Sequence, residues 1–241
     1  MPTILAIETS SELASCALLR GETVLSRVSS GVRTHSQSVL PMIQELLAEA
    51  GIALRDCDAI AFGSGPGSFT GVRTACGVAQ GLAFGAGLPV VPVVTLDAMA
   101  LACHQQHGAQ DVLTVLDARM GEVYWAQYRF GADVGPQTVL APVLSAPADV
   151  QPQGAPLACG NGLSAYGEIY AAGPLAGLMA QGHAAIMPHA EQIAQLAVLA
   201  FAAGQTVTAA EAQPLYLRNK IAYTQAERAA MAVAKAAEGG A

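Results

Sequence analysis

The segment best suited to ligand chemistry is a glycine-rich run from Gly63 to Gly71, which reads Gly-Ser-Gly-Pro-Gly-Ser-Phe-Thr-Gly. An apolar segment precedes it and a long uncharged segment follows, so the run should connect a strand to a helix. Glycine lets a backbone approach a neighbour closely, and Ser68 or Thr70 can cap the helix. Helix N-termini also attract phosphate. The run therefore predicts an anion cradle, a tight backbone contact with another chain, or a plain turn without a ligand.

The run matches neither common nucleotide-binding signature. It has no nearby lysine, as a Walker A loop requires, and Ser68 occupies the third glycine position of the dinucleotide pattern. A nucleotide-dependent transferase would still use this loop around ATP and Mg²⁺, together with Glu8 at the end of the first predicted strand. Glu8 can equally serve to solvate that strand end. The candidate nucleotide-binding residues are Glu8, Ser10, Gly65, Gly67, Ser68 and Thr70.

Other reactive side chains are sparse. Asp117 and Glu122 flank a predicted turn, where a solvated aspartate that bonds locally is a better interpretation than a catalytic acid. Ser10 and Ser68 have no histidine placed by the sequence to activate them. Four histidines show no metal-ligand spacing: His104, His107, His183 and His189. The sequence therefore nominates no catalytic residue and no metal ligand.

The elements that position these residues follow an α/β pattern with a mixed sheet. We predict strands at residues 3–8, 15–19, 23–28, 58–62 and 90–94, the first three as a meander. Helices are predicted at 36–50, 72–85 and 95–106. The first begins between Thr34 and Ser38, because either can cap it and Pro41 suits a first turn. Thr95 is predicted to cap the third helix.

A second block carries weaker signals. We predict strands at 112–116, 123–130, 139–144 and 157–159, a helix at 190–203, an extended piece at 214–218 and a helix-prone tail from Ala226. The chain is therefore divided into an N-terminal α/β lobe, residues 1–108, which carries the glycine loop, and a smaller C-terminal α/β lobe, residues 109–241. The C-terminal segment can return to the first lobe.

Composition narrows the function further. The net charge is −7 with only 11 Lys and Arg residues and no basic block, so any contact with nucleic acid should come through a partner. Five irregularly spaced cysteines suit small buried side chains in a reducing cytoplasm. No signal peptide is visible, and glycines and prolines divide the uncharged stretch Thr74–Leu96 into a buried α/β unit. We expect a cytoplasmic protein with no membrane contact.

Five segments, in this order and spacing, together resemble the TsaB (also called YeaZ) family. They are Ile4-Leu-Ala-Ile-Glu-Thr-Ser-Ser11, His35-Ser-Gln37 with Leu40-Pro41, Gly65-Pro-Gly-Ser-Phe-Thr-Gly-Val-Arg73, Asp117-Ala-Arg-Met-Gly-Glu-Val-Tyr-Trp125 and Pro214-Leu-Tyr-Leu-Arg-Asn219. The resemblance covers residues 3–220. It implies an actin/Hsp70/sugar-kinase-like fold with two α/β lobes, and a bacterial subunit of the machinery that makes threonylcarbamoyladenosine beside the tRNA anticodon.

The same resemblance implies a pseudo-enzyme that scaffolds and activates a catalytic relative, TsaD. TsaD-like proteins carry a His-x-x-x-His metal site on the first long helix, whereas the matching residues here are His35 and Val39, so that site should be absent. TsaD is the implied partner in a heterodimer, with the small ATPase TsaE joining them and tRNA bound only through the complex. No cofactor is expected to bind tightly, and ATP or ADP with Mg²⁺ would bind weakly at the partner interface.

By resemblance, the first two helices form the interface with TsaD, or with a second copy in a homodimer of the isolated protein. Small residues on the second helix are what close helix packing needs. The candidate interface residues are His35, Leu40, Ile43, Leu47, Thr70, Val72, Arg73, Gly77, Gln80, Gly81 and Phe84. Two alternatives stay open: an enzyme acting alone, as a nucleotide-dependent transferase or glycoprotease-like protein, and a small-molecule phosphate sensor.

Overall fold

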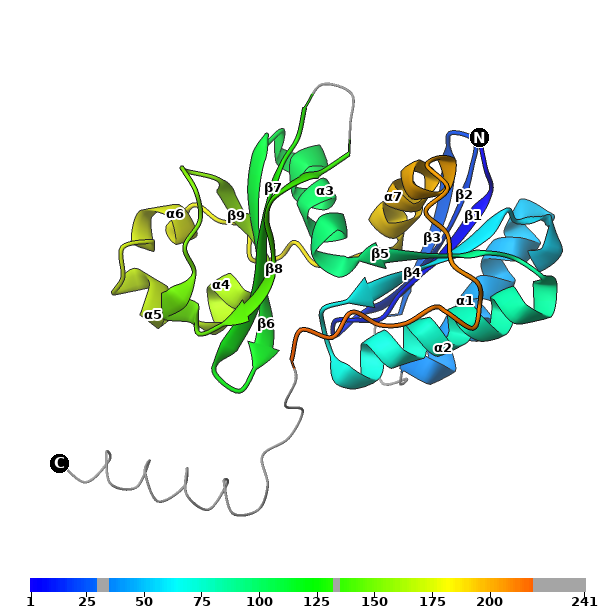
Figure 1. Cartoon of the computed structure of the whole chain (residues 1–241), viewed down its shortest axis with the longest axis horizontal. Helices are drawn as coiled ribbons and strands as arrows, with labels where there is room; N and C mark the ends of the chain where they lie inside the picture. Colours follow the sequence, from blue (N-terminus) through cyan, green and yellow to red (C-terminus); the bar gives the residue numbers. More distant parts are fainter. Residues whose placement is uncertain (30–34, 132–134, 219–241) are drawn as a thin grey trace, which may run out of the picture.

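The computed structural model describes residues 1–29, 35–131 and 135–218, which form two α/β lobes side by side (Figure 1). The first sheet has the order β3-β2-β1-β4-β5. Its strands are β1 (Ile4–Glu8), β2 (Ala14–Arg20), β3 (Thr23–Ser29), β4 (Ala59–Gly65) and β5 (Val90–Val94). The first three pair antiparallel as a meander, while β1, β4 and β5 run parallel. This confirms the predicted mixed sheet and actin/sugar-kinase-like fold class.

Helices cover both faces of the first sheet. On one face lie α1 (His35–Ala50) and α2 (Phe69–Ala86), and on the other lies α7 (Ala190–Ala202) (Figure 1). The alternation along β1 explains this arrangement: Leu5 and Ile7 pack in the core under α1 and α2, while Ile4 and Ala6 pack under α7. Because both faces are buried, the strand reads as a continuous apolar run.

The second sheet has the order β8-β7-β6-β9. Its strands are β6 (Asp111–Arg119), β7 (Glu122–Arg129), β8 (Gln137–Ser145) and β9 (Leu157–Cys159). One face packs on α3 (Thr95–His107), and the other on the short helices α4 (Gly162–Ala165), α5 (Gly167–Ala171) and α6 (Ala176–Ala180). Two 3-10 turns complete the described elements, η1 (Leu54–Asp56) and η2 (Pro147–Asp149). Although α7 follows this lobe in sequence, it packs on the first sheet.

The end of the described chain returns along the first lobe and then crosses to the second. We call the segment Ala212–Arg218 the strap. The carbonyl of Ala212 accepts a hydrogen bond from the side chain of Gln80 on α2 at 2.9 Å. Further along, the backbone N–H of Leu215 donates to the carbonyl of Ser64 at 2.7 Å. Arg218 then pairs with Glu122 of β7 at 2.6 Å. The strap therefore connects α2 to the second sheet (Figure 1).

Two local predictions can be compared directly with the structure. The helix α1 begins at His35 and keeps Pro41 inside it; Thr34, the alternative cap, lies outside the described residues, as does the tail from Ala226. The prediction that Thr95 caps α3 was wrong. Its hydroxyl group instead accepts a hydrogen bond from the N–H of Gly65 at 3.1 Å and donates one to the carboxylate of Glu8 at 3.4 Å. Within the described residues, none of the helices combines the length and the apolar composition that a membrane span needs.

Candidate functional site

The glycine loop packs against its own chain, at the end of β1. A Cβ atom on Gly71 would lie 1.9 Å from the carbonyl oxygen of Thr9, and one on Gly67 would lie 2.6 Å from Ser10. Two hydrogen bonds hold the contact: Thr9 Oγ1 donates to the Gly71 carbonyl at 2.6 Å, and the Ser68 N–H donates to the Ser10 carbonyl at 2.7 Å. These two glycines are therefore required by an internal backbone contact rather than by another chain.

Hydroxyl capping at this loop occurs as predicted. The α2 helix begins at Phe69, and the side chain of Ser68 accepts a hydrogen bond from the N–H of Gly71 at 3.4 Å. The alternative cap, Thr70, lies inside the first turn and is exposed. The loop therefore joins β4 to α2 with its tightest contact facing the loop after β1.

Glu8 is sealed inside the first lobe. Its side chain is fully buried, and its carboxylate accepts hydrogen bonds from the N–H of Ser10 and the hydroxyl group of Thr95. A Cβ atom on Gly63 would collide with Glu8 Oε2 at 1.8 Å, so glycine at that position makes room for the carboxylate. Burial raises the pKa of Glu8. The expectation that Glu8 solvates the strand end was wrong, because the carboxylate is buried, and its role beside ATP and Mg²⁺ stays a prediction.

A cavity of about 430 Å³ lies between the lobes. The first lobe contributes the loop after β1 and the start of α2, the second lobe contributes the ends of β6 and the loop after β9, and the strap closes one side. Of the candidate nucleotide-binding residues, Ser10, Gly67 and Ser68 line this cavity. The others do not: Glu8 is sealed, Thr70 lies on the outer face of α2, and Gly65 is covered by the strap carbonyl of Leu215.

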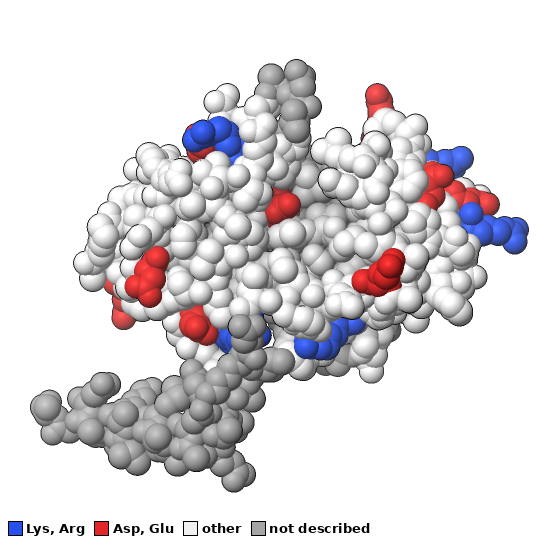
Figure 2. All heavy atoms as spheres, viewed as in Figure 1, with Lys and Arg blue, Asp and Glu red and all other residues white. Residues whose placement is uncertain are grey.

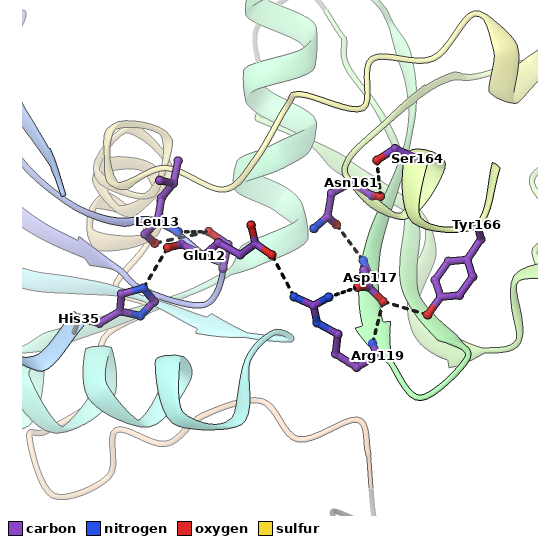
Figure 3. Close-up of polar contacts among 9 residues, drawn as sticks. Glu12, Leu13, His35, Asp117, Arg119, Asn161, Ser164 and Tyr166 are labelled. Atoms are coloured by element: carbon purple, nitrogen blue, oxygen red, sulfur yellow. Dashed lines mark hydrogen bonds and ion pairs between the residues drawn. The ribbon is translucent and has the colours of Figure 1, made fainter. Parts of the chain in front are cut away.

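Asp117 lies at the wall of this cavity and is held by several neighbours (Figure 3). Its side chain is only 7% exposed. The carboxylate accepts hydrogen bonds from the N–H of Arg119 at 2.8 Å and the hydroxyl group of Tyr166 at 2.9 Å, and it forms an ion pair with the Arg119 guanidinium. The Asp117 N–H donates to Asn161 Oδ1 at 2.9 Å. The expected solvated aspartate is therefore buried and paired, because the loop after β9 covers the turn.

One polar chain crosses from this turn to the first lobe (Figure 3). Arg119 pairs with Glu12 at 2.9 Å, and the carbonyl of Glu12 lies 3.2 Å from Nε2 of His35 at the start of α1. Both charged partners are well exposed, at 70% and 73%, so the pair contributes little to stability. His35, one of the candidate interface residues, therefore contacts the loop after β1 from the start of α1.

The cavity offers binding groups rather than a reactive set. Its described lining includes three serines, Ser10, Ser11 and Ser68, but no histidine or lysine that could act as their general base. Its guanidinium groups and aromatic rings, from Arg73, Tyr124 and Tyr216 among others, suit noncovalent contacts. Elsewhere in the described residues, no three His, Cys, Asp or Glu side chains cluster in a way that could hold a metal ion.

The second candidate region is the outer surface of α1 and α2. Leu40 is 46% exposed and Phe84 is 84% exposed, and Thr70, Gly77 and Gly81 are also exposed. Four further candidates are half-buried: His35, Leu47, Arg73 and Gln80. Ile43 and Val72 are each only 3% exposed, because Ile43 packs in the core under α1 and Val72 lines the cavity between the lobes beside Gly65. Neither side chain therefore lies on the surface that we predicted.

The glycines of α2 differ from those of the loop. A Cβ atom on Gly77, Gly81 or Gly85 would meet nothing within 4 Å. Their backbone is helical, where glycine is up to ~1 kcal/mol less favourable than alanine. No contact in the described residues explains why these positions lack a side chain. Figure 2 shows only scattered charged side chains on the face of the molecule that it presents, with broad uncharged surface between them.

Sequence reasoning missed the residues that complete the cavity from a distance. Asn161, Tyr166 and Glu12 meet Asp117 and Arg119 through loops whose approach has no periodic signal. Tyr216 and Arg218 lie in a segment predicted as extended, within the C-terminal part that we expected could return to the first lobe, but the pattern gave no sign that these two side chains would line a cavity. The pair Asn161-Gly162 after β9 is typical of a turn, and it is a local signal that could have drawn attention to Asn161.

Comparisons with known proteins agree over nearly the whole chain. A family model described as TsaD, tRNA N6-adenosine threonylcarbamoyltransferase, matches residues 23–237. The Escherichia coli (strain K12) protein named tRNA threonylcarbamoyladenosine biosynthesis protein TsaB is 42% identical over 225 residues, covering 91% of this chain and 96% of that protein. The Haemophilus influenzae protein of the same name is 39% identical, covering 92% and 95%. The solved structure of YeaZ from Pseudomonas aeruginosa has 40% identity and a TM-score of 0.81, covering 90% of this chain and 100% of that one.

Proposed function

Because this chain belongs to the TsaB (YeaZ) family, within the wider family that the TsaD model describes, we propose that it takes part in tRNA threonylcarbamoyladenosine biosynthesis as a non-catalytic subunit. It pairs with a TsaD-type protein, which carries out threonylcarbamoyl transfer to adenosine. Its role is to scaffold and activate that partner. Contact with tRNA occurs through the assembled complex, which suits the net charge of −7.

The observation that carries this proposal is the open face of α2. Gly77 and Gly81 leave a stretch of helix surface without side chains, bordered by the exposed ring of Phe84. Leu40 adds a second exposed apolar side chain from the neighbouring helix α1. A helix from a partner could approach such a surface closely, which gives the solvent-facing glycines a physical purpose. An interface of standard size, about 800 Å² per partner, is enough for a specific complex.

The cavity between the lobes supports the non-catalytic part of the proposal. Its serines lack a neighbouring base, and Asp117 is already engaged by Arg119 and Tyr166. Weak binding of ATP or ADP with Mg²⁺ at the partner interface stays a prediction. A metal ion held by Glu8 would require that carboxylate to leave its contacts with Ser10 and Thr95.

Assembly then has two competing forms. In isolation the face formed by α1 and α2 pairs with the same face of a second copy, and the TsaD-type protein displaces that copy. An ATPase of the TsaE type joins the heterodimer. Self-pairing would cover the apolar face whenever the catalytic partner is absent.

The test is a single bulky charge on the open face. Gly81→Arg should fold normally, because its side chain would project into solvent. We expect it to lose association with the cognate TsaD-type protein, measured by co-purification and by light scattering. The matched control is Gly177→Arg on α6, another exposed helical glycine with nothing within 4 Å of its Cβ position.

If Gly81→Arg co-purifies with the partner as well as the unaltered protein does, the α2 face is not the docking site. Loss of association in both variants would instead show that an added arginine anywhere on the surface interferes. Only a selective loss at Gly81, with an unchanged melting temperature, supports the proposal.

A further inference from the structure

Arg73 is held in a defined position at the N-terminal end of the open α2 face. Its guanidinium carbon lies 3.4 Å from the ring centroid of Phe69 and 4.8 Å from that of Tyr216 on the strap. Nη1 also donates a hydrogen bond to the Phe69 carbonyl at 2.7 Å. The two rings are 50% and 51% exposed, so this cluster of one cation and two aromatic rings stands at the surface. Arginine and tyrosine in such settings are frequent binding hot spots.

Arg73 is also the only charged residue among the 18 residues of α2. The other arginines around the lobe junction are neutralised: Arg119 pairs with Glu12 and Asp117, and Arg218 pairs with Glu122. Arg73 forms no ion pair within the described residues. Its guanidinium group contacts two aromatic rings and donates one hydrogen bond to a carbonyl, so most of its N–H donors stay available to a partner.

Docking on this face would remove Arg73 from water. A buried guanidinium without a carboxylate is strongly unfavourable, whereas one that meets a carboxylate in bidentate geometry becomes a source of specificity. We propose that Arg73 is a specificity-determining residue, which selects a partner whose docking helix places an aspartate or glutamate opposite the Phe69–Arg73–Tyr216 cluster. This inference rests on the proposed function and names the chemistry that the partner must bring.

The α1 and α2 helices of a second copy lack that chemistry. Its α2 has no acidic residue, and the two carboxylates of its α1, Glu45 and Glu49, are already engaged by Arg27. A symmetric pair would therefore bury Arg73 without a new carboxylate, or keep it at a wet rim. Arg73 thus favours an acidic partner, and it disfavours self-association because its charge would be left unpaired there.

The test measures both associations with one substitution. Arg73→Gln removes the charge and keeps a polar side chain of similar length. We expect its Kd for the cognate TsaD-type protein to rise roughly tenfold or more, since truncating one partner of a buried charge pair is costly. Self-association of the same variant, followed by analytical ultracentrifugation, should be unchanged or stronger. Arg73→Lys should also weaken the heterodimer, because an ammonium group cannot reproduce the bidentate fork.

Arg20→Gln is the control, because Arg20 is an exposed arginine at the turn between β2 and β3, away from α2. An unchanged heterodimer Kd for Arg73→Gln would overturn the inference while leaving the docking face intact. Equal weakening of both associations would also overturn it, since Arg73 would then only support the shape of α2. If the unaltered protein does not bind the partner at all, the proposed function itself fails, and the inference fails with it.

Discussion

Replacing the outward-facing glycines of α2 by alanine should separate stability from docking. Gly77 and Gly81 lie inside a helix that runs from Phe69 to Ala86, and a Cβ atom at either position would meet nothing within 4 Å. Neither has a backbone conformation that requires glycine. The double variant Gly77→Ala/Gly81→Ala should therefore make the isolated subunit more stable.

The expected gain follows from helix propensity. Each replacement should raise the free energy of unfolding by roughly 0.5–1 kcal/mol, because alanine loses less backbone entropy on folding than glycine does. The two together give about 1–2 kcal/mol, which corresponds to a rise of roughly 2–8 °C in melting temperature for a domain of this size. The measurement is made at several protein concentrations, because self-association would add a concentration-dependent contribution.

Docking should change in the opposite direction. If a partner helix packs against the bare backbone at Gly77 and Gly81, the added methyl groups intrude on a close contact, and overpacking of this kind costs about 1–3 kcal/mol. The Kd for the TsaD-type protein should then rise roughly 5- to 150-fold, as measured by isothermal titration calorimetry. Gly177→Ala on α6 is the matched control, which changes an open glycine outside the face.

A variant that is stabilised and binds its partner with unchanged affinity would show that the glycines serve no close contact with the partner. A variant that is destabilised would show that there is no room for a methyl group at these two positions.

Two further outcomes test the interior of the first lobe and its junction with the second. Gly71→Ala should lower the free energy of unfolding by at least about 2 kcal/mol, because its Cβ would lie 1.9 Å from the Thr9 carbonyl, and an unchanged melting temperature would contradict this contact. Burial raises the pKa of Asp97 to about 6, so the folded state holds this proton more tightly than the unfolded state, and stability is lost as the pH rises through 6. The free energy of unfolding of Asp97→Asn, measured by urea titration, should therefore rise by up to about 3 kcal/mol relative to that of the unaltered protein as the pH goes from 4 to 7.5. A difference in unfolding free energy that stays constant over this range would contradict the raised pKa.

The sequence predicted most regular elements within a few residues because their patterns are local. The apolar run at β1, the 3.6-residue spacing of α1 and the cap at Ser68 each act within one element. The short helices α4, α5 and α6 were not predicted, since segments rich in alanine, glycine and proline carry little periodicity, and their helical turns depend on packing against the second sheet.

The candidate site was only partly predictable for the same physical reason. The loop glycines could be located from sequence, but their contact with Thr9 and Ser10 depends on the strand order, which brings the ends of β1 and β4 together. Glu8 looked available because it ends a strand, yet Thr95 from a distant helix covers it. The resemblance indicated the α2 face as a whole, but it did not show that the side chain of Val72 would be buried.

In the function that we propose, this chain supplies a docking face and depends on a partner for chemistry. The most direct measurement is modification of tRNA from threonylcarbamoyl adenylate by the purified chain, by the purified TsaD-type protein, and by both together. We expect no product with the chain alone, and a faster reaction with both proteins than with the TsaD-type protein alone. Threonylcarbamoyladenosine formed by the chain alone would contradict this proposal.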